Sequence, residues 1–506
     1  MGSKARGAEG LAAVPAHQRD RIVTGMRWTF WLSALSAPFG YGTSALLART
    51  GPEVIGTYGL LMVYITLISS IFYLGGDAVV VKYVPEIQPE RRPAFLVSYL
   101  LVISLGLLPW LAIAAFWPHG LHYLFGAQGG VSFQFIVLCL SPIYIVFSLV
   151  AAALKGMLEM AWAQALVRIV TVGSFLLYAI LFFFGHGLLE TYYTELIWGI
   201  YLGLVALGAI VGFHQLRKSE GWRSSWRRLN FFVPPGFWRY VFSLEQSSAL
   251  GFLMARLDFI LVLNFAGLAL LGKYVAIYAV AQGIQVVNKY FVDALLPSLT
   301  NVLATRNLNA ASQIYSVNLR ILFVANMMLT CALMFFIGPI VLLMGHAYVS
   351  ITGLFVLMVL FFGLAAPGAV GSTALTSVGM QQRTVWVNLG QVALFIVLFL
   401  SLWPRWHLLG AILAQGISIL ISYIILLAVA RFSVPFKFSA AKDYVIFLLV
   451  GGLAGAIALF LGPLPLPIAA VAWIIAVGAF LLLAGYRLGE AKMLVVFFLP
   501  AKRAQR

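Results

Sequence analysis

The sequence contains very little charge and almost no cysteine. Only 9% of its 506 residues are charged, and the two cysteines are Cys139 and Cys331. A soluble domain of this length could not bury its apolar surface, because 62% of the residues are hydrophobic and the mean hydropathy is +1.00. Both cysteines lie in apolar stretches without metal-ligand spacing, so we interpret them as small packing residues.

The sequence also lacks the patterns of a catalytic centre. It has no His/Cys cluster with metal spacing and no nucleotide-binding glycine loop, so we expect no catalytic residue, metal or cofactor. His119 and His122 are three residues apart without a third ligand, which is typical of interfacial polar residues. A membrane-embedded glycosyltransferase or polymerase stays the non-transport alternative. The short outer loops argue against it, since such enzymes usually carry catalytic residues on a large loop.

What the sequence does contain is long apolar runs. Fourteen of them are long enough to cross a bilayer as helices, for which about 20 residues suffice. The sequence therefore predicts an all-α polytopic membrane protein. The predicted spans are 28–48, 57–81, 94–117, 131–154, 163–184, 191–214, 241–264, 272–296, 317–339, 350–374, 384–403, 407–430, 442–462 and 466–486.

The basic residues predict the orientation of these spans. The net charge is +17, and most of the 32 lysines and arginines lie in segments on the same side as residues 1–27. The positive-inside rule places that side, and with it both termini, in the cytoplasm. We attribute the positive charge to topology and anionic lipid, and expect no nucleic-acid partner. Residues 1–27 lack the apolar core and cleavage site of a signal peptide, so we expect a cytoplasmic segment.

Two stretches, 216 residues apart, carry the same pattern. The first copy runs from Ile55-Gly56-x-Tyr58 to Asp77, and the second from Leu271-Gly272-x-Tyr274 to Asp293. Polar residues recur at matching positions, Thr66, Ser69, Tyr73 and Asp77 against Gln282, Gln285, Lys289 and Asp293. On a helix four such positions span about 80°, so each copy predicts one polar stripe. A polar stripe in both halves of a membrane protein indicates a shared central cavity, which makes a transporter the leading hypothesis.

The repeat also predicts the domain organisation. Five predicted spans lie between the two copies, so the second copy comes six spans after the first and points the same way. The repeats are therefore parallel about an axis along the membrane normal. The polar segment between them contains Trp222 and Trp226 beside several arginines, which is typical of an interfacial helix. We predict the following segments: 1–27 cytoplasmic, 28–214 a first six-helix bundle, 215–240 the linker, 241–430 a second six-helix bundle, and 431–506 two additional spans and a basic tail.

Ionisable residues inside the spans are the candidate site residues. Each costs about 2.5–3.5 kcal/mol at the bilayer centre, so it has to face water or a partner. The candidate cations are Arg168, Arg256 and Lys289, and the candidate coupling or gating acids are Asp77, Asp258 and Asp293. Arg168 is the sharpest of these, because a lone guanidinium can grip a phosphate with two hydrogen bonds. Pairing with an acid on another helix is the alternative.

Simpler partners are open for four charged residues. Lys289 and Asp293 are four apart and could pair on one helix face. Asp77 could contact Lys82 or water near the cytoplasmic end of its span. Glu245 could pair with Arg239.

Residues 51–87 resemble the second-span signature of bacterial polysaccharide flippases, and residues 255–285 resemble the matching start of their second half. These transporters form a branch of the multidrug/oligosaccharidyl-lipid/polysaccharide (MOP) exporter superfamily, and the resemblance covers most of residues 20–430. It implies two six-helix bundles around a central cavity, in the cytoplasmic membrane of a bacterium. The implied function is flipping of an undecaprenyl-diphosphate-linked oligosaccharide by alternating access.

The resemblance also implies partners and roles. The arginines and Lys289 would bind the diphosphate, and the three aspartates would serve coupling or gating. The implied partners are the lipid-linked oligosaccharide, membrane lipids, and polysaccharide polymerase and export proteins. Two related functions stay open, a flippase for lipid-linked peptidoglycan precursors and a cation-coupled multidrug exporter. Arginine in both halves favours an anionic lipid-linked substrate.

Overall fold

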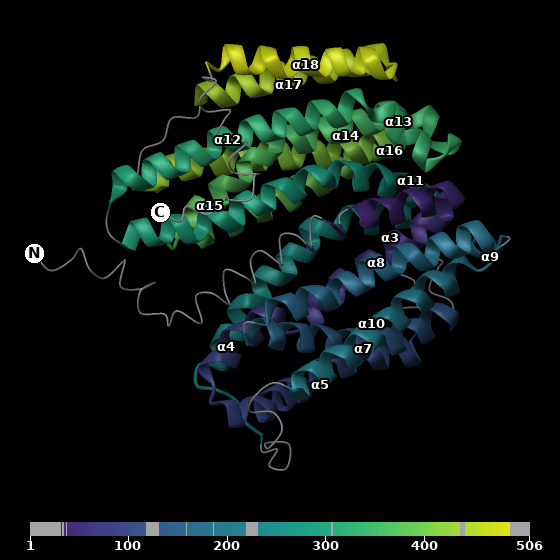
Figure 1. The fold of residues 1–506 in the computed structure, drawn as a ribbon, viewed down its shortest axis with the longest axis vertical. Coiled ribbons are helices and arrows are strands. Elements are labelled where there is room, and N and C mark those ends of the chain that lie inside the picture. The colour runs from purple at the N-terminus through teal and green to yellow at the C-terminus, as the bar shows by residue number, and fades with distance from the viewer. Residues whose placement is uncertain are drawn as a thin grey trace, which may run out of the picture. The chain divides into compact units, whose positions relative to one another are not determined.

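The computed structural model describes residues 32, 35–36, 38–117, 131–157, 159–185, 187–218, 231–304, 307–435 and 441–485. Their regular structure is helical, and no strand occurs among them (Figure 1). Helices satisfy their backbone hydrogen bonds internally, as apolar segments within a bilayer require. The predicted all-α membrane fold is confirmed.

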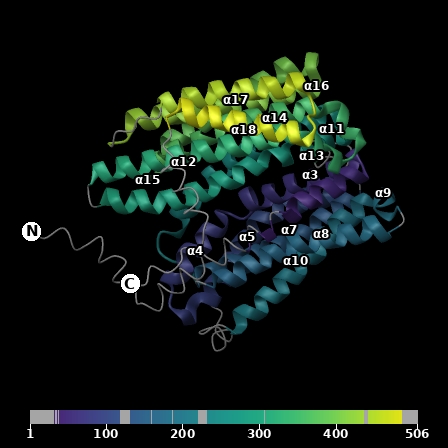
Figure 2. The ribbon, with the colours of Figure 1, turned by 45° about the horizontal axis from the view of Figure 1, so that its top comes forward.

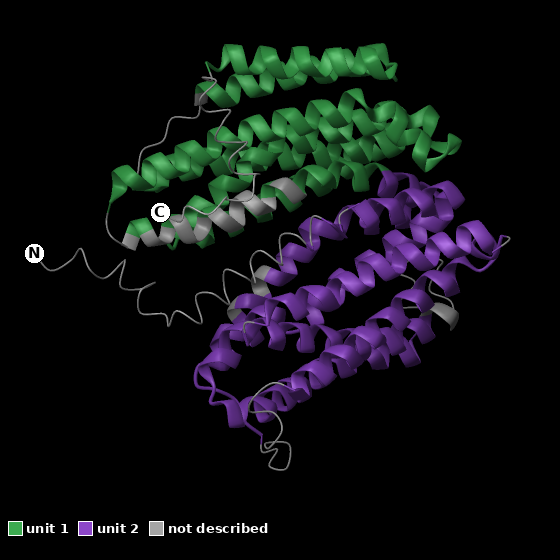
Figure 3. Cartoon of the chain, in the orientation of Figure 1, with its two compact units in different colours: residues 1–7, 277–506 green, residues 8–276 purple. Residues whose placement is uncertain are grey.

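The chain divides into two compact units (Figure 3). The N-terminal unit comprises Ala8–Ala276, and the C-terminal unit comprises Ile277 to Arg506. The division falls inside one long helix, whereas the repeat places its boundary in the linker 215–240. The six-helix bundles 28–214 and 241–430 therefore stay a prediction drawn from the repeat.

Helix α7 is the centre of packing in the N-terminal unit. It contacts α10, α4, α8 and α5. The described residues 38–50 are helical as well. The further helices of this unit are α3 (Pro52–Leu67), α4 (Gly76–Glu86), α5 (Arg92–Phe116), α7 (Val131–Gly156), α8 (Met160–Phe184), α9 (Leu188–Thr191), α10 (Tyr193–Lys218) and the first part of α11 (Phe237–Ala304). The predicted interfacial helix lies largely in 219–230, outside the described residues.

The C-terminal unit contains the rest of α11 and a bundle in which α14 contacts α12, α16 and α17. Its further helices are α12 (Leu308–Phe335), α13 (Ile337–Met344), α14 (Thr352–Ala365), α15 (Ala369–Ser377), α16 (Gln381–Ser433), α17 (Ala441–Leu461) and α18 (Leu466–Leu483). Helices α17 and α18 lie side by side, as Figure 2 shows, and both contact α12. Arg320 of α12 pairs with Asp443 of α17 at 3.4 Å, which ties the added helices to the bundle.

Eleven helices of the described residues are long and apolar enough to cross a membrane. Two helices, α11 and α16, are much longer than the roughly 20 residues that are needed to cross a bilayer. Each contains one residue with non-helical backbone angles, Gly267 (φ 76°) in α11 and His407 (φ 44°) in α16, so each consists of two helical segments joined at a kink. The count of fourteen spans stays a prediction, because the first predicted span is described only in part.

The glycine that both copies of the repeat share lies at a helix crossing inside the N-terminal unit. A Cβ atom on Gly272 would lie 1.7 Å from the carbonyl oxygen of Pro52, and one on Gly56 would lie 2.4 Å from that of Leu268. Neither position has room for any side chain. The two starts of the repeat therefore pack backbone against backbone, as small residues allow between membrane helices.

Candidate functional site

The first copy of the repeat is not one continuous helix. Helix α3 passes into a π-helical turn at Ile68–Phe72, and α4 begins only at Gly76. Leu74, Gly75 and Gly76 have φ angles of 43°, 85° and 59°, in the left-handed region that favours glycine. The prediction of a single helix over 57–81 is therefore wrong, because the Gly75-Gly76 pair breaks it.

Side chains from two other helices satisfy the backbone groups that this break exposes. The hydroxyl of Tyr99 on α5 donates to the carbonyl oxygens of Tyr73 and Leu74, both at 2.9 Å. The carboxylate of Glu245 on α11 accepts a hydrogen bond from the Gly75 N–H at 2.9 Å. These contacts fix the break as a defined element. Glu245 serves this role rather than the predicted pairing with Arg239.

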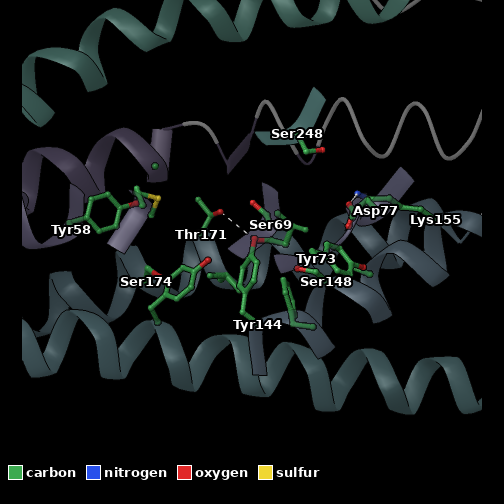
Figure 4. A pocket seen from close by; sticks show the side chains of 18 of the residues that line it. Tyr58, Ser69, Tyr73, Asp77, Tyr144, Ser148, Lys155, Thr171, Ser174 and Ser248 are labelled. Atoms are coloured by element: carbon green, nitrogen blue, oxygen red, sulfur yellow. Dashed lines mark hydrogen bonds and ion pairs between the residues drawn. The ribbon is translucent and has the colours of Figure 1, made fainter. Parts of the chain in front are cut away.

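A cavity of about 570 Å³ lies beside the break, entirely within the N-terminal unit (Figure 4). Half of its lining residues carry a hydroxyl group, and five carry an aromatic ring. The hydroxyl-bearing residues are Thr43, Tyr58, Ser69, Tyr73, Tyr144, Ser148, Thr171, Ser174, Tyr201 and Ser248. Phe147 supplies the fifth ring. The size falls within the range of small-molecule sites, about 300–1,000 Å³.

An ion pair lies at one end of the cavity, opposite Tyr58 (Figure 4). The ammonium of Lys155, on α7, lies 2.8 Å from Oδ2 of Asp77, on α4. Both side chains stay partly accessible, at 25% and 45%. Asp77 thus pairs with Lys155 rather than with Lys82, whose ammonium lies 3.9 Å from the centre of the Tyr240 ring. Among the described residues that line the cavity, this pair is the charged group, so the lining is neutral overall.

Tyr73 places a buried hydroxyl in this lining. The residue is 2% exposed, and its hydroxyl has no hydrogen-bond partner within the described part of the chain. A buried hydroxyl without a partner costs free energy, which a bound water or ligand can recover.

The predicted polar stripe of the first copy divides between two places. Ser69, Tyr73 and Asp77 line the cavity. Thr66 instead accepts a hydrogen bond from Nε of Arg256 at 3.0 Å, which links α3 to α11. The π-helical turn and the break change the helical register between these positions, since a π-turn holds more residues than an α-turn.

The predicted cations of the N-terminal unit lie outside the described lining. Arg168, on α8, is half-buried and follows the lining residue Val167. The guanidinium of Arg256 lies 5.0 Å from the centre of the Phe259 ring, in addition to its contact with Thr66. Their proposed role toward a phosphate stays a prediction.

Asp258 is 2% exposed and is held by two donors. The hydroxyl of Tyr274 donates to its Oδ2 at 2.8 Å, and the Phe259 N–H donates to its Oδ1 at 2.9 Å. Tyr274 is the tyrosine of the Leu271-Gly272-x-Tyr274 pattern. One polar residue of the second copy therefore has a packing role, and coupling by Asp258 stays a prediction.

The second polar stripe lies on α11 in the C-terminal unit. Gln282 is exposed and Gln285 is half-buried. The side chains of Lys289 and Asp293 are outside the described residues, so their pairing and their roles stay predictions. From Gln282 to Asp293 the backbone of α11 is helical without a break, because the one non-helical residue of α11, Gly267, comes before this stretch.

The sequence interpretation missed a further polar stripe, which lies on α7 and belongs to neither copy of the repeat. Tyr144, Ser148, Ala151 and Lys155 line the cavity at spacings of four, three and four residues, which is one face of a helix. The signal was present in the sequence as a tyrosine, a serine and a lysine at helical spacing. It lies outside the two repeat copies, so the repeat did not reveal it. The described residues include no group of three His, Cys, Asp or Glu that could hold a metal ion.

No protein-family model and no curated protein matches the chain. Solved structures do match it. The lipid II flippase MurJ in an inward closed conformation has a TM-score of 0.68 and 15% identity, over 90% of this chain and 98% of the other. An inward-facing multidrug resistance MATE family transporter of the MOP superfamily has a TM-score of 0.64 and 11% identity, over 78% and 94%.

A third similar structure is a MOP superfamily transporter from Pyrococcus furiosus. Its TM-score is 0.55 at 15% identity, over 81% of this chain and 94% of the other. The chain has the fold of MOP superfamily transporters. At these identities the likeness establishes the fold, and the polysaccharide branch stays a proposal.

Proposed function

We propose that this protein is a transporter that flips a lipid-linked, undecaprenyl-diphosphate-bearing oligosaccharide across the cytoplasmic membrane by alternating access. The observation that carries the proposal is the broken helix α3–α4 beside a hydroxyl-lined cavity in a bundle of apolar helices. Non-helical backbone at membrane depth is tolerated where it lines a cavity, and transporters commonly build substrate sites from interrupted helices. The lining also supports a polar substrate.

The charge of the cavity bears on the multidrug alternative. An exporter of lipophilic cations needs an acidic cavity, whereas Asp77 here is paired with Lys155 at 2.8 Å. The lining is neutral and rich in hydroxyl groups, which suits a sugar-bearing substrate better than a lipophilic cation.

A flippase for a lipid-linked peptidoglycan precursor is the second candidate. The flippase MurJ matches this chain over 90% of its length, which favours that candidate specifically. Both candidate substrates carry a glycan on a lipid diphosphate, and a hydroxyl-lined cavity is compatible with the glycan of either. The added helices α17 and α18 are compatible with both.

Reconstitution separates these functions. The purified full chain is placed in liposomes with a fluorescent undecaprenyl-diphosphate oligosaccharide, fluorescent lipid II, or ethidium. Movement between leaflets is followed by a membrane-impermeant quencher, and ethidium uptake by fluorescence. We expect quenching of the oligosaccharide-lipid to exceed that of protein-free liposomes.

Lipid II moving while the oligosaccharide-lipid does not would establish the second candidate. Ethidium uptake alone, driven by an ion gradient, would establish the multidrug exporter. No movement of any of the three would contradict the proposal of a transporter for these substrates.

Alternating access would expose the site to each side of the membrane in turn. Partners for the product would be a polysaccharide polymerase and export proteins on the outer side, with membrane lipids around the helices. Both termini would lie in the cytoplasm of a bacterium. Reporter fusions at Gly126 and Gly462 are then expected to be external, and a fusion at Ser225 to be cytoplasmic.

A further inference from the structure

We propose that the cavity of the N-terminal unit binds the sugar moiety of the substrate, while the diphosphate is bound elsewhere. This inference rests on the proposed function and deepens it by dividing the headgroup between two places. Four features of the described residues support it: the hydroxyl groups, the aromatic rings, the unpartnered hydroxyl of Tyr73 and the neutral charge.

The hydroxyl groups suit a ligand that both donates and accepts hydrogen bonds. Ser69 and Thr171 donate to carbonyl oxygens of their own helices, at 3.1 and 3.3 Å, and so does Thr43, at 2.9 Å. Each of these oxygens keeps lone-pair capacity toward the cavity. A sugar hydroxyl could donate to them, whereas a phosphate, which only accepts, could not use them.

The aromatic residues suit the other face of a sugar. Tyr58, Tyr73, Tyr144, Phe147 and Tyr201 contribute rings to the lining. Rings bury apolar surface, and tyrosine adds a polar handle at its edge. The C–H faces of a pyranose can pack on such rings while its hydroxyls reach the surrounding oxygens. This mixture of rings and hydroxyls is poorly suited to a bare diphosphate.

The hydroxyl of Tyr73 is the most direct indication of a ligand. It is buried in the wall of the cavity and has no partner among the described residues. The backbone beside it is already satisfied, since Tyr99 donates to the Tyr73 carbonyl. A ligand hydroxyl at this point would supply the missing hydrogen bond.

The charge places the diphosphate elsewhere. A buried diphosphate has to be matched by excess cations, because desolvating an unpaired anion is costly. The described lining holds one cation, Lys155, and Asp77 neutralises it at 2.8 Å. The ion pair can instead bind the hydroxyls of one sugar ring, since the Asp77 carboxylate accepts hydrogen bonds from them and the Lys155 ammonium donates hydrogen bonds to them.

The test is an internal competition. The purified full chain in detergent is mixed with equal amounts of undecaprenyl diphosphate and undecaprenyl-diphosphate–N-acetylglucosamine, and the bound species are counted by native mass spectrometry. Both probes share the lipid and the two phosphorus atoms, and they differ in the sugar and in the one phosphate oxygen that the sugar esterifies. The change of this ratio in cavity variants therefore reports the contribution of the sugar site. We expect the sugar-bearing lipid to be favoured about tenfold, as a few net hydrogen bonds would give.

Two variants locate the effect. Tyr73→Phe removes only the unpartnered hydroxyl and is expected to lower the ratio about fivefold without loss of folded protein. Ser148→Trp fills the cavity and is expected to bring the ratio to about one, with binding of the bare lipid unchanged.

Tyr178→Phe is the matched control for Tyr73→Phe. The Tyr178 hydroxyl donates to the Ile197 carbonyl at 3.1 Å in the same unit, and Tyr178 is not one of the residues that line the cavity. This substitution is expected to lower stability and leave the ratio unchanged.

A ratio of one in the unmodified protein would overturn the inference, as would an unchanged ratio in Tyr73→Phe and Ser148→Trp. These results are distinct from failure of the proposed function. Translocation with a ratio of one rejects the sugar site and keeps the flippase. A sugar-dependent ratio without translocation in liposomes rejects the flippase and keeps the site.

Discussion

The two copies of the repeat begin alike and then differ. Each opens with a glycine in the same place, Gly56 or Gly272, and these glycines meet at one backbone crossing. Twenty residues further on, the first copy has Gly75-Gly76 and a break, whereas the second has Phe291-Val292 and stays helical. The shared glycine serves packing, and the unshared pair creates the irregular backbone beside the cavity.

The comparison shows that a repeat in sequence need not repeat a site. Both copies contribute polar residues at matching positions, yet the described cavity lies beside the broken copy. A continuous helix presents one stripe, while a broken helix also exposes backbone groups and turns side chains out of register. The glycine pair therefore distinguishes the copies more sharply than the polar residues do.

Alanine at Gly272 is expected to have the largest effect. Its Cβ would lie 1.7 Å from the Pro52 carbonyl oxygen, and backbone cannot move aside as a flexible side chain can. We expect a loss of about 3 kcal/mol in the free energy of unfolding, as for severe overpacking. The measurement is the monodisperse fraction in detergent after heating.

Gly251→Ala is the control for this substitution, because nothing lies within 4 Å of a Cβ there. It is expected to leave stability unchanged or to raise it slightly. Equal behaviour of the two variants would contradict the proposed crossing of the copies.

Alanine at Gly75 is expected to act on the break. A residue with φ of 85° costs about 1–2 kcal/mol without glycine, and its Cβ would lie 2.8 Å from the Val79 side chain. We therefore expect slower leaflet-to-leaflet movement of the oligosaccharide-lipid at normal membrane abundance. Gly203→Ala, in an open helical position, is the matched control. Unchanged transport in Gly75→Ala would show that the backbone break is not needed for transport.

Valine at Thr66 removes the acceptor of the Arg256 hydrogen bond. The two groups lie 3.0 Å apart, and a bond to a charged group contributes about 1.5 kcal/mol. We expect that loss in the free energy of unfolding, measured by thermal unfolding.

Arg256→Lys keeps the charge without the planar fork and is expected to retain partial function, whereas Arg256→Ala is expected to lose most of the function. Normal transport by well-expressed alanine variants at both Arg256 and Arg168 would reject a role for them in binding the diphosphate.

Reversing the ion pair is expected to have the smallest effect. Because Asp77 and Lys155 are 45% and 25% accessible, solvent limits their coupling to about 0.5–1 kcal/mol. Asp77→Lys and Lys155→Asp are each expected to lower thermal stability, and the double variant to recover most of the loss. A double variant no better than the worse single variant would show that the pair does more than attract.

The sequence predicted the class of fold because long apolar runs admit few structures in a bilayer. Ser69, Tyr73 and Asp77 were predicted from their helical spacing, and they line the cavity although the helix is broken between them. Their role toward a substrate stays a prediction. The break was harder to predict, although Gly75-Gly76 is visible, because glycine is frequent in membrane helices and usually serves packing.

The ion pair between Asp77 and Lys155 could not be predicted from the sequence, for a different reason. Asp77 and Lys155 lie on helices that are 78 residues apart in the chain, and Lys82 was the nearer candidate in sequence. Their contact depends on the packing of α4 against α7. Arg168 and Arg256 were predicted to be site residues because charged residues are rare inside membrane spans. That rarity does not show which way a side chain points, and neither residue is among the described lining of the cavity.

The account rests on a cavity in the N-terminal unit that is open to water. Thiol labelling tests this most directly, after Cys139 and Cys331 are replaced by alanine. Ser69→Cys lies in the lining, whereas Leu176→Cys lies on the outer face of α8, where the native leucine is 49% exposed. A charged, membrane-impermeant thiol reagent is expected to modify Ser69→Cys about tenfold faster than Leu176→Cys in native membranes, because thiolate forms only in contact with water. Equal or slower labelling of Ser69→Cys would contradict a polar cavity beside the broken helix.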